Sequence, residues 1–316
     1  MMILPKLEYK KATSLAEAIT LCKGQKGNAR YLAGGTDLIP RIKQRLAVPK
    51  VIIDIKDIPE LKTIKRVNGS LEIGSAVTLF DLKKNPQIKE NFPALSESLE
   101  ATSCETLQMR GTIGGNILQD TRCIEHNQSR EWREARGFCI RSGGKECNVV
   151  KGAKTCFANY CGDNAPALIT LQAETRLVGP DGERMVKLAD LFTGDALKPF
   201  ALKAGEIMTA IRIPLKKTKG AYEKLRIRES MDYPLIGIAI SAIGTNARIC
   251  VGAVGVAPKV YEVKNVAIEA AAKEVAEKAT SDAHPVANSV VSPAYRKKMV
   301  GVLIRRAIKR AILGVK

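Results

Sequence analysis

The chain has 316 residues, 45% of them hydrophobic and 26% charged, which is the composition of a globular protein large enough for two domains. It contains no apolar run of the roughly 20 residues that span a bilayer and no N-terminal secretion signal, so we expect a cytoplasmic protein without a membrane span. The formal charge of +19 suggests nucleic acid, but the basic residues are dispersed, only 4% of residues are aromatic and no nucleic-acid-binding motif stands out, so no nucleic-acid partner is predicted.

The first part of the chain predicts a small βαβ-like unit. Ser14 and Glu17 fit a capping box at the start of a helix. The hydrophobic pattern predicts a helix over 15–22, a strand over 29–32, a helix over 38–46 and a buried strand over 51–55. The turn Ala33-Gly34-Gly35-Thr36-Asp37 joins the first strand to the second helix.

A hairpin and a second glycine-rich turn come next. Asn68-Gly69 between segments 63–67 and 71–73 indicates a type I′ hairpin. A helix predicted over 94–104 then leads to the turn Gly111-Thr112-Ile113-Gly114-Gly115-Asn116, and neither glycine-rich turn is a G-x-G-x-x-G or Walker A motif. Glycine lets main-chain N–H groups and nearby threonine hydroxyls approach a phosphate, although a tight turn without a ligand is the commoner origin of a single Gly-Gly pair.

The regular pattern is interrupted over residues 121–161 and resumes at Gly162, so we interpret this segment as an insertion. Pro214 and the run 216–220 mark a domain boundary. The remaining predicted elements are strands over 176–178, 221–226, 237–242 and 248–254, a turn over 179–182, and helices over 264–279 and 294–312.

Five of the eight cysteines lie in this insertion. Cys123, Cys139, Cys147 and Cys156 follow one another at intervals of 16, 8 and 9 residues, and Cys161 comes five residues later. Four converging thiolates suit an iron–sulfur cluster or a structural zinc ion, and the spacing does not distinguish them. Unrelated reduced cysteines remain an alternative, whereas disulfides are disfavoured in a reducing compartment.

Other chemically active residues do not form a recognisable set. His126 lies inside the insertion, where it could fill a ligand position, but we interpret it as a solvated loop residue, and His284 has no evident partner pattern. The sequence contains no serine or cysteine nucleophile motif, so no catalytic residue is predicted and we expect electron transfer through cofactors.

Several collinear segments together resemble the FAD-binding medium subunit of molybdenum hydroxylases, such as those of carbon monoxide dehydrogenase and xanthine dehydrogenase. The match covers almost the entire chain. The cysteine insertion resembles that of the 4-hydroxybenzoyl-CoA reductase β subunit, in which four cysteines at this spacing hold an additional [4Fe–4S] cluster. The segments that carry the family resemblance are Ala33-Gly34-Gly35-Thr36-Asp37-Leu38, Gly111-Thr112-Ile113-Gly114-Gly115-Asn116, Gly162-Asp163 with Ala165-Pro166-Ala167-Leu168, Ala221-Tyr222-Glu223-Lys224 and Ser292-Pro293-Ala294-Tyr295-Arg296-Lys297.

The resemblance implies an α+β protein with a fold of the vanillyl-alcohol-oxidase type. Two αβ subdomains would hold FAD, and a C-terminal αβ domain would contain a small antiparallel sheet. The expected limits are 1–56 for the first FAD-binding subdomain, 57–217 for the second, which carries the insertion 121–161, and 218–316 for the C-terminal domain.

The resemblance also implies the cofactor-binding residues. The two glycine-rich turns would hold the pyrophosphate and nearby sugar groups, Asp163 would accept hydrogen bonds from hydroxyls, and Lys224 would lie near the isoalloxazine or the phosphate. The four cysteines Cys123, Cys139, Cys147 and Cys156 would ligate the cluster, and Cys161 would be an ordinary buried thiol. The expected FAD contacts are Leu32, Ala33, Gly34, Gly35, Thr36, Asp37, Thr102, Thr112, Ile113, Gly114, Gly115, Asn116, Asp163 and Lys224.

The implied function is that of an FAD and [4Fe–4S] electron-transfer subunit. Its partners would be a large subunit with the molybdopterin cofactor and a small subunit with two [2Fe–2S] clusters, and electrons would drive reductive dehydroxylation of an aryl-CoA thioester. One alternative is the FAD subunit of a xanthine- or carbon-monoxide-dehydrogenase-like hydroxylase that passes electrons to NAD or a quinone. Another is a noncatalytic basic protein with a structural metal.

A basic cluster in the insertion suggests an additional partner. Arg130, Arg133, Arg136, Arg141 and Lys145 lie close together in the sequence. If their side chains form an exposed face, an acidic ferredoxin could dock there as electron donor by electrostatic steering. Side chains that are merely solvated, or that contact sister subunits, are the alternative.

Overall fold

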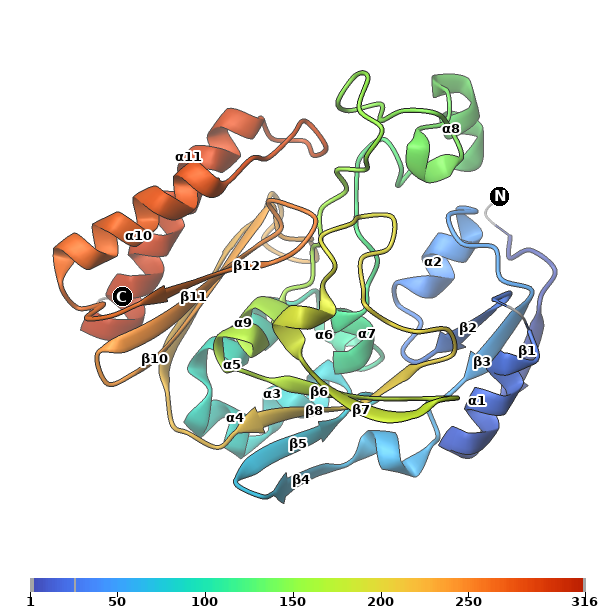
Figure 1. Cartoon of the computed structure of the whole chain (residues 1–316), viewed down its shortest axis with the longest axis horizontal. Coiled ribbons are helices and arrows are strands. Elements are labelled where there is room, and N and C mark those ends of the chain that lie inside the picture. Colours follow the sequence, from blue (N-terminus) through green and yellow to red (C-terminus); the bar gives the residue numbers. More distant parts are fainter. Residues whose placement is uncertain (1–2, 26, 315–316) are drawn as a thin grey trace.

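Three β-sheets, each built from a separate stretch of sequence, frame the structure, a computed structural model that describes residues 3–25 and 27–314 (Figure 1). The first sheet is parallel, with strand order β1-β3-β2, and it lies with its helices at the N-terminal end of the molecule. Its elements are β1 (Glu8–Lys11), α1 (Leu15–Lys23), β2 (Ala29–Leu32), α2 (Leu38–Lys43) and β3 (Val51–Asp54).

The start of α1 shows how the local sequence sets this unit. The Ser14 hydroxyl accepts a hydrogen bond from the Glu17 amide at 3.2 Å, as the capping box predicts. The Glu17 carboxylate, however, accepts from the amide of Thr13 at 2.8 Å, one residue before the cap. Strand β1 was not predicted, because its sequence Glu-Tyr-Lys-Lys is polar and mostly exposed.

The second sheet is antiparallel, with strand order β4-β5-β8-β6-β7. Asn68 (φ 47°) and Gly69 (φ 74°) join β4 to β5 in the left-handed conformation that a type I′ turn requires. The elements of this region are β4 (Ile64–Val67), β5 (Ser70–Gly74), α3 (Leu79–Lys84), α4 (Pro86–Asn91), α5 (Pro93–Ala101), α6 (Glu105–Gln108), α7 (Ile113–Ile117), α9 (Asn164–Thr170), β6 (Glu174–Gly179), β7 (Gly182–Lys187) and β8 (Ile207–Pro214).

The third sheet is also antiparallel, with strand order β12-β11-β10-β9, and long helices cover one of its faces (Figure 1). Helix α11 packs on β9 and β10, whereas α5 and α9 pack against the same sheet from the core of the second region. Its elements are β9 (Lys219–Leu225), β10 (Ile236–Ile243), β11 (Asn246–Gly252), β12 (Lys259–Val263), α10 (Glu269–Asp282) and α11 (Pro293–Ile308), followed by a π-helical turn (Lys309–Leu313).

Residues 121–161 project from this frame as the separate green segment at the top of Figure 1. They contain a short helix, α8 (Arg130–Arg136), and are otherwise mostly irregular. At the base, the Arg122 amide donates to the Asn159 carbonyl at 2.7 Å and the Asn159 amide donates to the Arg122 carbonyl at 2.8 Å. Because the two ends pair with each other, the rest of the fold is nearly continuous without the segment, as an insertion requires.

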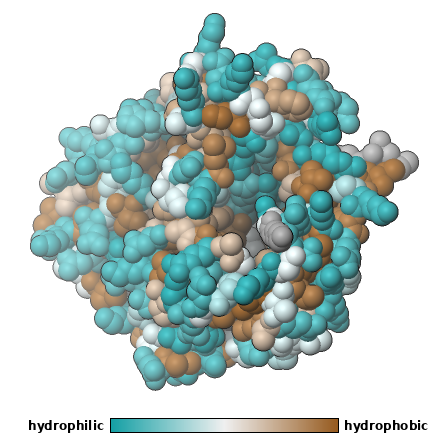
Figure 2. Space-filling model, turned by 45° about the vertical axis from the view of Figure 1, so that its right-hand side comes forward, coloured by the Kyte–Doolittle hydropathy of each residue, from teal (hydrophilic) through white to brown (hydrophobic). Residues whose placement is uncertain are grey.

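The visible face of the molecule is largely hydrophilic, including its upper end, with apolar residues in scattered patches (Figure 2). Within the described residues, no helix combines the length and apolar character needed to cross a bilayer. The predicted mixture of helices and sheets, with a small antiparallel sheet in the C-terminal part, matches the observed α+β architecture. The domain limits at 56/57 and 217/218 stay a prediction.

Candidate functional site

A cavity of about 1100 Å³ opens between the N-terminal unit, the second region and the loop that precedes β10. Three of the predicted FAD contacts are not on its wall, and the others are. The predicted residues that line the cavity are Ala33, Gly34, Gly35, Thr36, Asp37, Thr102, Thr112, Gly114, Gly115, Asn116 and Asp163.

Leu32, Ile113 and Lys224 are the three that do not line the cavity, and their contact with FAD stays a prediction. The side chains of Leu32 and Ile113 are buried in hydrophobic clusters instead of facing the cavity. The Lys224 ammonium lies behind the wall, where it donates to Asp163 at 3.1 Å, to the Ala101 carbonyl at 3.0 Å and to the Asp232 carbonyl at 2.8 Å. Three protein oxygens therefore bind the Lys224 ammonium, which helps to fix the orientation of Asp163.

The two glycine-rich segments pack main chain against main chain. A Cβ atom on Gly34 would overlap the Arg110 carbonyl and lie 2.9 Å from the Gly111 Cα, so only glycine fits there. A Cβ on Gly114 would lie 2.7 Å from the Ser75 Cβ. Gly115 is different, because it is exposed and its Cβ would meet only the Thr112 hydroxyl, at 3.0 Å. Two glycines therefore serve the packing, and Gly115 keeps the cavity wall flat.

The main-chain N–H groups of the two segments are used differently. Within the described chain, no N–H of residues 34–37 donates a hydrogen bond, and Gly35 has φ 75°. Such unpaired, successive N–H groups form the kind of concavity that binds an anion. The second segment forms the start of α7, not the free turn predicted, and its N–H groups donate as follows: Ile113 to the Val77 carbonyl (3.0 Å), Gly114 to the Ser75 carbonyl (2.9 Å), Gly115 to the Thr112 hydroxyl (3.1 Å) and Asn116 to the Thr112 carbonyl (2.8 Å).

A buried polar network supports the part of the cavity wall that Thr102, Asn116 and Asp163 form. The Asn116 side-chain oxygen accepts from the Asn164 side-chain amide at 3.0 Å, which fixes the orientation of Asn116. The Thr102 hydroxyl donates to the Ser98 carbonyl at 2.6 Å. Asp163 is buried, and its carboxylate accepts from the Tyr222 hydroxyl at 2.9 Å as well as from Lys224. The cavity is therefore bordered by side chains whose positions are set before any ligand binds.

Several polar residues of the wall were not predicted from the sequence. Gln119 is buried, and its side-chain nitrogen has no hydrogen-bond partner among the described residues. Asp120 forms ion pairs with Arg41 and with Arg141. Gln119 and Asp120 come two and three residues after α7, so their position just beyond the second glycine-rich segment was the one available signal.

These features fit FAD. A dinucleotide requires a large, mostly preformed cavity, N–H donors for its diphosphate and polar side chains for its sugar hydroxyls. The described structure offers the N–H groups of 34–37, the orphaned Gln119 nitrogen and the Asn116 and Asp163 side chains around one cavity.

A second, much smaller cavity of about 10 Å³ lies in the insertion. All four predicted metal ligands, Cys123, Cys139, Cys147 and Cys156, line it, and all four are free thiols. In the described parts of the chain, no three cysteine, histidine or acidic side chains already stand in metal-ligating geometry. The fold thus places the four thiols on the lining of one cavity, and thiolates are the donors that an iron–sulfur cluster or zinc needs.

Cys161 is separate from this group, as predicted. It is buried and does not line the small cavity. Burial raises the pKa of the Cys161 thiol to about 12, so it stays protonated and unreactive at neutral pH.

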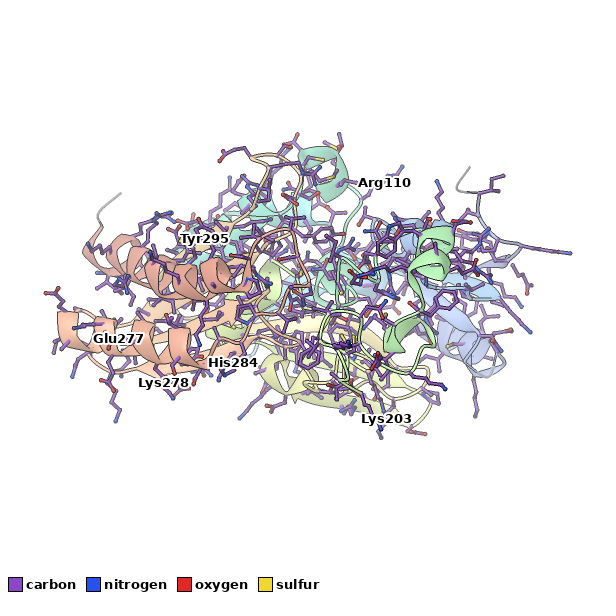
Figure 3. All side chains as sticks on the ribbon, turned by 90° about the horizontal axis from the view of Figure 1, so that it is seen from above. Arg110, Lys203, Glu277, Lys278, His284 and Tyr295 are labelled. Atoms are coloured by element: carbon purple, nitrogen blue, oxygen red, sulfur yellow. The ribbon has the colours of Figure 1, made fainter. Side chains whose placement is uncertain are left out.

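The interpretation of His126 was wrong. The residue is buried, and its ring nitrogen Nδ1 lies 3.0 Å from the Ser142 hydroxyl. Burial, together with the nearby charges of Arg141 and Arg133, lowers the pKa of His126 to about 3, so the ring is neutral. His284, by contrast, is exposed beyond α10 on the C-terminal domain (Figure 3).

The proposed docking face also needs correction. Arg133 is buried and donates to the main-chain carbonyls of Gln44 and Arg45, both at 3.1 Å. Arg141 points inward to Asp120. Of the five basic residues, Arg130, Arg136 and Lys145 are exposed. Arg133 and Arg141 therefore hold the insertion against the rest of the chain and are not available to bind a partner.

Comparisons with known proteins agree with this arrangement. The family described as FAD binding domain in molybdopterin dehydrogenase matches residues 5–216. The carbon monoxide dehydrogenase medium chain of Hydrogenophaga pseudoflava is 28% identical and covers 98% of both chains. The aldehyde oxidoreductase FAD-binding subunit PaoB of Escherichia coli K12 is 27% identical, over 96% of this chain and 98% of its own.

A solved structure has the same fold. A chain in the crystal structure of cyanide-inactivated Cu,Mo-CO dehydrogenase aligns with a TM-score of 0.79 at 26% identity, over 98% of each chain. This confirms the predicted α+β fold, an FAD-binding part followed by a C-terminal domain with a small antiparallel sheet. The chain belongs to the family of FAD binding domains in molybdopterin dehydrogenases and is an oxidoreductase subunit.

Proposed function

We propose that this chain is the FAD-carrying electron-transfer subunit of a heteromeric molybdenum enzyme. A large subunit would contain the molybdopterin cofactor and the substrate site, and a small subunit would contain two [2Fe–2S] clusters. The observation that carries the proposal is the cavity of about 1100 Å³ bordered by both glycine-rich segments and Asp163. Relatives named as the medium chain or FAD-binding subunit of larger enzymes align along nearly their whole length, which supports the same division of labour.

The residues of this chain would bind and orient the cofactor. The unpaired N–H groups of 34–37 would donate to the diphosphate, and the flat surface at Gly115 would let the cofactor approach the main chain. Asp163, held by Tyr222 and Lys224, would accept from hydroxyl groups. Bound FAD would supply the redox chemistry, since a flavin can exchange electrons either singly or in pairs.

We also propose that Cys123, Cys139, Cys147 and Cys156 hold a [4Fe–4S] cluster. The support is that these four thiols, far apart in sequence, line one small cavity, whereas Cys161 does not. The cysteine spacing resembles that of the 4-hydroxybenzoyl-CoA reductase β subunit. A structural zinc ion is the competing occupant, because it takes the same four ligands.

The direction of electron flow separates two versions of this function. The relatives reported above, a carbon monoxide dehydrogenase and an aldehyde oxidoreductase, favour a hydroxylase-type enzyme whose FAD passes electrons outward to NAD or a quinone. Neither is named as a 4-hydroxybenzoyl-CoA reductase, so reductive dehydroxylation of an aryl-CoA thioester is supported by the cysteine insertion alone.

Purification of the tagged chain from its native cells tests the assembly. We expect two further chains to copurify, one with molybdenum and one with the EPR signals of two [2Fe–2S] clusters. If the flavin in that complex is reduced by a low-potential donor and reoxidised by neither NAD nor a quinone, the reductive version is supported. Isolation of the chain alone, under conditions that preserve complexes of its relatives, would contradict the proposal.

An acidic ferredoxin is proposed to dock on the exposed basic residues Arg130, Arg136 and Lys145. We expect the rate at which reduced ferredoxin reduces the complex to fall steeply with salt, because exposed charges are screened beyond about 8 Å at ~0.15 M ionic strength. The Arg130→Glu, Arg136→Glu variant should be much slower at low salt. Lys278→Glu, on the exposed face of α10 at the other end of the molecule, is the control (Figure 3). A rate of reduction by ferredoxin that changes neither with salt nor with charge reversal would rule out this docking face.

A further inference from the structure

The two cavities share a wall. His126 and Arg141 each line both the large cavity and the cysteine cavity, and both residues belong to the insertion. Anything bound among the cysteines is therefore separated from anything bound in the large cavity by these side chains, and a charge on either of them acts on both sites.

Arg141 makes direct contacts toward both cavities. One guanidinium nitrogen lies 3.9 Å from the Cys156 sulfur and also donates to the Ala196 carbonyl. The other donates to the Asp120 carboxylate. Only 8% of the Arg141 side chain is exposed, so solvent screens its charge weakly.

Asp120 continues this contact into the large cavity. It follows α7 by three residues, lines the large cavity and also pairs with Arg41 of α2. The sequence of contacts Arg41, Asp120, Arg141 and Cys156 thus joins the N-terminal unit, the second region and the insertion. The ion pair with Asp120 fixes the position of the Arg141 guanidinium. Cys156 therefore accepts a hydrogen bond from a group that stays positively charged, because arginine is not deprotonated in proteins.

We propose that Arg141 is a positioning residue that holds the cysteine segment against the large cavity and raises the reduction potential of the cluster through Cys156. The inference rests on the proposed [4Fe–4S] cluster. A reduced cluster carries one more negative charge than the oxidised cluster, and a nearby cation with a hydrogen bond to a ligand sulfur stabilises that charge. Loss of the cation should therefore make the cluster harder to reduce.

The test compares Arg141→Gln with wild type and with Lys145→Gln, which removes an exposed charge from the same insertion. EPR-monitored redox titration of the full chain should show the cluster of Arg141→Gln at lower potential. We expect at least a tenfold fall in its reduced-to-oxidised ratio at fixed potential, about 59 mV for one electron. Lys145→Gln should titrate like wild type. An unshifted Arg141→Gln cluster, or an equal shift in Lys145→Gln, overturns the proposal.

Two measurements separate this inference from the proposed function. If wild-type protein contains no iron and sulfide, both the proposed cluster and the proposed role of Arg141 are wrong. If the wild type contains the cluster and Arg141→Gln leaves its reduction potential unchanged, only the proposed role of Arg141 is wrong. If Arg141→Gln loses its iron, Arg141→Lys decides, because it keeps the charge: retained iron with a potential near wild type supports the proposal, and lost iron overturns it.

Discussion

The Gly115→Val protein is expected to fold but to lose FAD. A valine side chain would project from the one exposed glycine of the second glycine-rich segment and would prevent close approach of the cofactor to the main chain. We expect the FAD dissociation constant to rise more than tenfold, a loss of at least about 1.4 kcal/mol of binding free energy. Flavin absorbance after purification and titration of the apoprotein with FAD measure the effect.

The choice of Gly115 matters for this experiment. A side chain on Gly34 or Gly114 would collide with neighbouring residues of the protein itself, so loss of FAD there would not distinguish a binding defect from misfolding. Gly24→Val is the matched control, because Gly24 is exposed at the end of α1 and its nearest neighbours would be 3.8 Å from the new Cβ. Full flavin occupancy in folded Gly115→Val would contradict the assignment of this wall to FAD.

The Cys147→Ser protein is expected to lose most of its iron while keeping most of its FAD. Cys147 is one of four thiols around the small cavity, and serine is a poor ligand for iron. The base of the insertion is closed by the Arg122 and Asn159 main-chain pair, so damage at the cluster should stay within the insertion. Iron, acid-labile sulfide and flavin analysis of the purified variant measure the result.

Cys161→Ser is the control for this variant. Cys161 is also a buried cysteine, at the end of the insertion, but it does not line the small cavity. It should retain iron at the wild-type level. Retention of the cluster in Cys147→Ser and its loss in Cys161→Ser would show that the ligand set is wrong.

Local signals in the sequence predicted much of the fold. Ser14 begins α1 and Asn68-Gly69 forms the hairpin, because a cap and a type I′ turn depend only on adjacent residues. The central strand β8 was missed, although it lies between β5 and β6 in the sheet. Most of its residues are buried and its sequence lacks a regular apolar–polar alternation, so periodicity does not reveal it.

The candidate site was predicted in part for the same reason. A Gly-Gly pair indicates a tight turn or a close approach of the main chain at its own position, so both glycine-rich segments of the cavity wall were predicted. The sequence did not predict that the N–H groups of the second segment are hydrogen-bonded while those of the first are unpaired among the described residues. Only tertiary contacts show that the carbonyls of Ser75 and Val77 accept hydrogen bonds from the second segment. Burial of His126 and Arg133 likewise depends on how the insertion folds onto α2 and its following loop, which no local pattern encodes.

Cofactor quantification on the anaerobically purified full chain tests whether this protein binds both FAD and an iron–sulfur cluster. FAD, iron, acid-labile sulfide and zinc would be measured per chain on the same sample. We expect one FAD, with about four iron atoms and four sulfides and no stoichiometric zinc. A chain that contains zinc in place of iron and sulfide would contradict the cluster, and a chain without flavin that also fails to bind added FAD would contradict the account as a whole.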